Sequence, residues 1–193
     1  MAKTHSDASR KERSRTIRWV VAVFFVTLVV SGIISLVSDE VMASSGLVAA
    51  FAILLGIVFV GIIFDIIGMA VATASEKPFH SMAARKVPGS QEAIRLLRNA
   101  ERVSSICNDV VGDICGVVSG SASATIAALI LAHVDTVWPR AVSLTMSALV
   151  AGLTVGGKAI GKTVAVNSCT QIVHLVGRVL YGVNQLKKKK SLR

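Results

Sequence analysis

The sequence predicts an all-α, polytopic membrane protein with four transmembrane helices, and three observations lead to this class. First, 53% of the 193 residues are hydrophobic and only 17% are charged, whereas soluble domains carry about 25% charged residues. Second, apolar residues collect in runs long enough for a helix to cross the ~30 Å hydrocarbon layer. Third, basic segments alternate with these runs, so the net charge of +10 needs no nucleic acid to explain it.

The first crossing is predicted over residues 19–37, which contain no charge and no proline. Six basic residues lie in the preceding segment, 1–18, whereas Asp39 and Glu40 follow the run. The positive-inside rule therefore places segment 1–18 in the cytoplasm. A cleaved signal peptide is the competing interpretation, but the apolar run exceeds the ~7–15 residues that such peptides use.

The second crossing is predicted to begin with the uncharged run 47–64 and to continue more weakly to about Ser75. The next segment, 76–102, is predicted to be a cytoplasmic helical hairpin, because its basic residues outnumber its acidic ones. Pro88-Gly89-Ser90 divides the hairpin into two short helices. Ser90 is predicted to cap the second of them.

Two further crossings are predicted over about 103–133 and 141–166, with Asp135 in the turn between them. The segment 167–186 has an apolar face at helical spacing, and we expect it to lie along the inner leaflet. The basic tail, 187–193, is expected to face either anionic headgroups or water. Both ends of the chain are therefore predicted to be cytoplasmic, in a protein of the cell (inner) membrane.

Glycines recur every fourth residue in the third and fourth crossings. Small residues at this spacing let membrane helices approach closely. The glycines therefore predict tight packing of these two helices on each other or on a second copy of the chain. They are Gly112, Gly116 and Gly120 in the third crossing, and the pairs Gly152/Gly156 and Gly157/Gly161 in the fourth.

Five ionisable residues fall within the predicted crossings: Asp65, Asp109, Asp113, Lys158 and Lys162. A charge at the centre of a spanning helix costs at least ~2.5–3.5 kcal/mol, so such groups face an interior or a watery cavity. The carboxylates, together with the amide oxygen of Asn108, are ligands that suit Mg²⁺. Buried Asp–Lys ion pairs, or lysines that extend to the headgroups, explain the same residues without a metal.

The segment Gly156–Thr163 satisfies the GxxxxGK[ST] pattern of phosphate-binding loops. Such a loop must follow a buried strand and open a helix, with a downstream acid for Mg²⁺. Here the pattern lies inside a predicted crossing, and no Asp or Glu follows Asp135. Nucleotide binding is therefore not predicted. The chain also lacks any Ser/His/Asp or Cys/His grouping, so neither catalytic residues nor an enzyme are predicted.

Five short segments, taken together in their order along the chain, allow a comparison with a known family. They are Gly68–Ser75, Ala93–Arg102, Val111-Gly112-Asp113, Gly157–Thr163 and Leu175–Tyr181. In this order, the stretch from about Phe64 to Lys189 resembles the transmembrane domain of the CNNM/CorB/CorC family, which is associated with Mg²⁺ and Co²⁺ transport. The family's Gly-Glu...Pro-Lys-Thr motif aligns with the segment Gly157–Thr163, and its Lys-Thr falls at Lys162-Thr163.

The chain departs from the family in five respects. Lys158 stands where the family has glutamate, and Gly161 stands where it has proline. The family's Ser-Glu-Thr segment has no equivalent near Gly68. Its paired CBS regulatory module has no counterpart in this sequence, and the crossing at 19–37 is additional.

The resemblance implies a CNNM/CorB-like domain over 47–186, a homodimer, and divalent-cation (Mg²⁺/Co²⁺) transport across the cell membrane. Mg²⁺ would then be the bound or transported ion, and the expected ligands are Asp65, Asn108, Asp109 and Asp113. The alternative is a non-transporting membrane scaffold or partner protein, in which the Lys158 ammonium replaces the cation and pairs with Asp109 or Asp113. The residues expected to be structural are Lys158, Lys162, Gly112, Gly116, Gly157 and Gly161.

Overall fold

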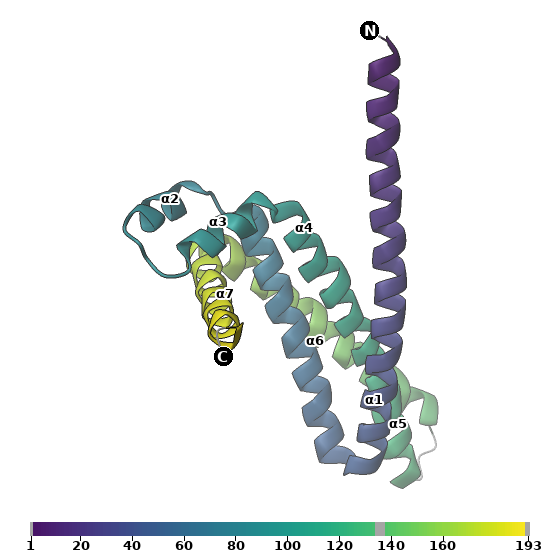
Figure 1. Cartoon of the computed structure of the whole chain (residues 1–193). Coiled ribbons are helices and arrows are strands. Elements are labelled where there is room, and N and C mark those ends of the chain that lie inside the picture. The colour runs from purple at the N-terminus through teal and green to yellow at the C-terminus, as the bar shows by residue number, and fades with distance from the viewer. Residues whose placement is uncertain (1, 134–137, 192–193) are drawn as a thin grey trace.

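The computed structural model describes residues 2–133 and 138–191, and the regular secondary structure in these residues is helical (Figure 1). The elements are α1 (Ala2–Thr73), α2 (Lys77–Ala84), α3 (Ser90–Arg98), α4 (Ala100–Ser105), the π-helix η1 (Ile106–Gly112), α5 (Asp113–His133), α6 (Pro139–Asn167) and α7 (Cys169–Ser191). Asp135 and the end of the basic tail, Arg193, lie outside the described residues.

Four stretches of these helices are long and apolar enough to cross a membrane. They are Ile17–Met42, Gly46–Thr73, Ala100–His133 and Pro139–Asn167. The all-helical class and the four long apolar helices are therefore confirmed. The third of these stretches joins α4, η1 and α5 into one continuous rod.

α1 consists of two helices that meet at Gly46, whose φ of 75° and ψ of 168° are not helical. Glycine adopts such angles readily because it has no Cβ. Figure 1 shows the chain reversing direction at this point, so the first two long helices run in opposite directions. The hydroxyl of Thr125 on α5 donates a hydrogen bond to Asp39 Oδ1 at 3.2 Å, which ties the first helix to the bundle.

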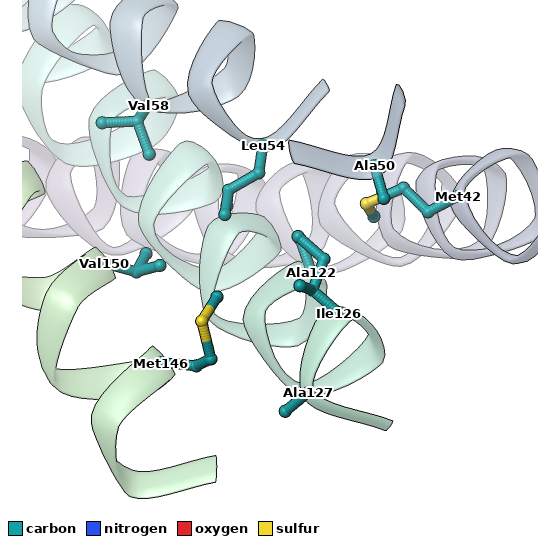
Figure 2. Packing of buried hydrophobic residues seen from close by; sticks show 9 residues of the cluster. All are labelled: Met42, Ala50, Leu54, Val58, Ala122, Ile126, Ala127, Met146 and Val150. Carbon is teal, nitrogen blue, oxygen red and sulfur yellow. The ribbon is translucent and has the colours of Figure 1, made fainter. Parts of the chain in front are cut away.

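A first apolar cluster lies near the Gly46 turn, where α1, α5 and α6 meet (Figure 2). Close packing of this kind holds helices together through many small dispersion contacts. The cluster therefore fixes the three helices at this end of the bundle. Its buried members are Met42, Ala50, Leu54 and Val58 of α1, Ala122, Ile126 and Ala127 of α5, and Met146 and Val150 of α6.

A second apolar cluster lies at the other end, where the α2–α3 hairpin and α7 meet the long helices. Phe79 of α2 is fully buried there, as are Ala93 of α3 and Val173 of α7. The remaining buried members are Ala70, Val71, Leu97 and Ala165. The two short helices predicted on either side of Pro88-Gly89-Ser90 are thus present and packed.

The prediction that Ser90 caps α3 is wrong. Gly89 precedes the helix in the left-handed conformation, with φ of 85°, and Ser90 is already helical. The Ser90 hydroxyl instead donates backwards to the carbonyl oxygen of Val87 at 2.7 Å. The turn therefore depends on the conformational freedom of Gly89 rather than on a side-chain cap.

Candidate functional site

Three polar side chains from three helices define what we call the polar centre: Asp65 of α1, Asn108 of η1 and Lys158 of α6. Along α1, Asp65 lies between residues of the first apolar cluster and residues of the second. Along α6, Lys158 likewise lies between residues of the two clusters. The polar centre is therefore enclosed between apolar layers in the middle of the bundle.

Two glycines of α6 bring this helix close to α1. A Cβ added to Gly157 would collide with the Cδ1 of Ile62, and a Cβ on Gly161 would lie 2.7 Å from the Cγ1 of Ile66. Because both pairs are spaced four residues apart, they form a single ladder along the helix contact. Lys158 follows Gly157 directly in the sequence, so the close contact between α6 and α1 places the Lys158 side chain beside α1.

The approach of the two helices produces an ion pair. Lys158 Nζ lies 3.9 Å from Asp65 Oδ1, and the side chains of Lys158 and Asp65 are 24% and 9% exposed. This separation is too long for a direct hydrogen bond, so the attraction is Coulombic. Removing two charges from water is costly, and each charge here offsets part of the cost of the other.

The π-helix η1 determines where Asn108 lies. A Cβ on Gly68 of α1 would collide with Asn108 Oδ1, so the carboxamide rests directly on the glycine. Gly112, at the end of η1, similarly leaves room for Lys158 Nζ, which would lie 3.4 Å from an added Cβ. The π-helix was not predicted from the sequence; such segments occur frequently at functional sites.

Two buried oxygens of the polar centre, Asp65 Oδ2 and Asn108 Oδ1, have no hydrogen-bond partner among the described residues. Asn108 uses its amide nitrogen to donate to the hydroxyl of Ser104 at 3.3 Å. A buried acceptor without a partner costs about 1–3 kcal/mol. A ligand that offers hydrogen-bond donors or positive charge would therefore gain most at these two oxygens.

The structure leaves the other predicted ligands outside the polar centre. Asp109 and Asp113 are exposed, and Asp109 Oδ2 accepts a hydrogen bond of 2.7 Å from the hydroxyl of Ser105. Lys162 is exposed as well. Among the residues whose side chains the structure describes (17–42, 46–133 and 138–187), groups of three or more His, Cys, Asp or Glu that could hold a metal are absent.

The predicted pairing of Lys158 with Asp109 or Asp113 is wrong, because its partner is Asp65. The glycine ladder explains the difference, since it turns this face of α6 toward α1 and away from the exposed side of the third long helix. The third and fourth long helices do pack on each other, but through the first apolar cluster rather than through most of their glycines, and packing of these glycines on a second copy stays a prediction. Added Cβ atoms at four of them would meet no atom within 4 Å: Gly116, Gly120, Gly152 and Gly156.

Two contact glycines that were not predicted from the sequence, Gly61 and Gly68, lie seven residues apart on α1. A Cβ on Gly61 would lie 2.8 Å from the Cβ of Cys115 on α5, and Gly68 contacts Asn108. These two glycines place the third long helix against α1. The signal was available, because small residues at helical spacing mark close helix contacts.

Comparison with protein-family models, with curated proteins and with solved structures finds no match to this chain. The resemblance to the CNNM/CorB/CorC family therefore stays a prediction from the sequence.

Substituting Gly68 by alanine is expected to displace Asn108 and to lower the free energy of unfolding by about 1–3 kcal/mol, the usual range for overpacking. Gly116→Ala is the matched control, because an added Cβ there meets no atom within 4 Å. The control should be neutral or slightly stabilising. Thermal unfolding of the detergent-purified protein measures both variants, and equal midpoints would contradict the contact between Gly68 and Asn108.

Proposed function

We propose that the chain is a polytopic protein of the cell (inner) membrane with both termini in the cytoplasm. The four long apolar helices support this, because large hydrophobic side chains on their outer faces are exposed and need lipid to cover them. The start of α1, the hairpin and α7 lie toward the same end of the bundle (Figure 1), which agrees with one basic, cytoplasmic side.

Within this membrane protein, Lys158 supplies the positive charge of the polar centre, and the protein acts as a non-transporting scaffold or partner subunit. The observation that carries this proposal is the separation of 3.9 Å between Lys158 Nζ and the buried carboxylate of Asp65. An ammonium group in this position cancels the negative charge that would attract a divalent cation. It would also repel a second cation strongly in surroundings of low dielectric constant.

Divalent-cation transport, the function implied by the family resemblance, is the second candidate. It is favoured by the two buried oxygens without partners, Asp65 Oδ2 and Asn108 Oδ1. Mg²⁺ takes oxygen ligands and keeps several waters, so one or two carboxylates can suffice. In this candidate Lys158 moves away from Asp65 when the cation enters.

The homodimer is proposed on the same family resemblance. The open faces of Gly152 and Gly156 support it, because small residues with free space beside them are suited to helix packing.

Thermal-shift titration of the detergent-purified full chain with Mg²⁺, Mn²⁺ and Co²⁺ distinguishes the two candidates. We expect no saturable stabilisation of the native protein. Lys158→Glu should gain it, because the introduced carboxylate and Asp65 can share one divalent ion. At a metal concentration of about 100 times Kd the gain would be about 2.7 kcal/mol. Adding Asp65→Asn to Lys158→Glu should abolish it, whereas Lys158→Gln, which adds no carboxylate, should not bind.

Saturable stabilisation of the native protein by Mg²⁺ that is lost in Asp65→Asn would overturn the scaffold proposal and favour transport. Asp113→Asn is the matched control, because the exposed Asp113 lies outside the polar centre. Loss of binding in Asp113→Asn but not in Asp65→Asn would contradict the role of the polar centre in both candidates.

A further inference from the structure

α7 has two apolar faces on opposite sides of the helix. The inner face includes Val173 and Gly177, which are buried, with Gly177 against Gly89 and Ala93 at the start of α3. The second face, which we call the outer stripe, consists of Leu175, Val179, Val183 and Leu186, with exposed fractions of 61%, 59%, 44% and 70%. These positions are spaced by four, four and three residues, so they line one side of the helix.

The orientation of α7 differs from that of the long helices. In Figure 1, α7 is seen almost along its axis, whereas the four long helices extend across the view. α7 therefore crosses them at a steep angle, at the end of the bundle that carries the hairpin. If the long helices span the bilayer, this direction lies close to the plane of the membrane surface. α7 is also not among the helices apolar enough to span.

The charge of α7 is entirely basic. Residues 169–191 contain no Asp or Glu, and the outer stripe runs directly into the sequence Lys187–Lys190. Arg178 and Lys187 are exposed. A helix that combines an exposed apolar stripe with basic residues binds the boundary between headgroups and acyl chains, and it prefers anionic lipid. A neutral apolar partner would explain the stripe but not the charge.

We propose that the outer stripe of α7 docks on the anionic surface of the bilayer that holds the long helices. The apolar side chains enter the acyl boundary, and the basic residues bind the headgroups. Each basic residue near such a surface strengthens binding about fivefold. Because the inner face of α7 holds α3, the docked helix also holds the hairpin against the membrane. This proposal rests on the membrane part of the proposed function and is independent of the role of Lys158.

Fluorescence quenching by lipids brominated on their acyl chains tests the docking in the full chain. Trp19→Phe and Trp138→Phe remove the native tryptophans, and Val179→Trp then reports from the outer stripe. Asn184→Trp is the matched control, because Asn184 is exposed on a different side of the same helix. In vesicles of phosphatidylcholine with phosphatidylglycerol, we expect severalfold stronger quenching for Val179→Trp than for Asn184→Trp. Replacing Lys187–Lys190 by glutamine should reduce this difference.

Equal quenching at the two positions would overturn the proposal. So would an unquenched Val179→Trp in a protein whose Val179→Cys variant forms a disulfide between two copies, because the stripe would then be a contact between copies. Alkaline extraction of the same membranes separates the two failures. Protein that stays in the pellet with equal quenching contradicts only the docking of α7, whereas protein that is extracted contradicts the membrane proposal itself.

Discussion

Substitution of Gly177 by alanine is expected to separate α7 from the hairpin and to lower the free energy of unfolding by about 3 kcal/mol, the upper end of the range for overpacking. The added Cβ would collide with the carbonyl oxygen of Gly89 and lie 3.1 Å from the Cβ of Ala93. A backbone oxygen cannot rotate away as a side chain can. Gly89 is itself held in the left-handed conformation, so the turn has little freedom to adjust.

Gly182→Ala on the same helix is the matched control for Gly177→Ala. An added Cβ at Gly182 meets no atom within 4 Å, and replacing a helical glycine by alanine stabilises by about 0.5–1 kcal/mol. The two variants should therefore move the unfolding midpoint in opposite directions. Limited proteolysis of segment 76–102 should be faster in Gly177→Ala alone. Similar behaviour of both variants would refute the backbone contact between α7 and the hairpin.

Breaking the ion pair of the polar centre has the second large expected effect. Lys158→Met should lower the free energy of unfolding by about 3 kcal/mol, because it leaves the buried Asp65 carboxylate without compensation. We expect the lower end of the range for a broken buried pair, since the Lys158 side chain is 24% exposed. Unfolding titrations in mixed micelles measure the effect. Lys162→Met, one turn further along α6 at an exposed position, should be nearly neutral.

The double variant Lys158→Met with Asp65→Asn should recover most of the lost stability, because no buried charge then lacks a partner. The coupling between the two substitutions should fall in the range of about 0.5–3 kcal/mol that contacting residues show. Losses that simply add would mean that the two charges do not depend on each other. That result would remove the basis for assigning the cation's place to Lys158.

The helices of this protein could be predicted from the sequence because their signals are local. An uncharged run of sufficient length predicts a long apolar helix wherever it occurs, and 47–64 and 141–166 both fall inside such helices. Pro88-Gly89-Ser90 likewise divides the hairpin through local backbone preferences. The capping error at Ser90 arose because a left-handed glycine can replace a side-chain cap, which composition alone does not reveal.

The partners within the polar centre could not be predicted in the same way. Whether Lys158 pairs with Asp65 or with Asp113 depends on how far α6 is rotated about its axis. That rotation is fixed by Gly157 and Gly161 fitting against isoleucines far away in the sequence. The π-helix adds a second difficulty, because it changes the number of residues per turn within the third long helix. A single helical period therefore does not describe the faces on both sides of it.

The reversal at Gly46 limits how well antibodies and proteases in solution can reach the protein. The helix direction changes there through a single non-helical residue, so the connection between the first two long helices has almost no loop. In the proposed membrane topology, this turn would offer hardly any free backbone to an antibody or a protease outside the cell. An epitope tag inserted there would have to break one of the two helices.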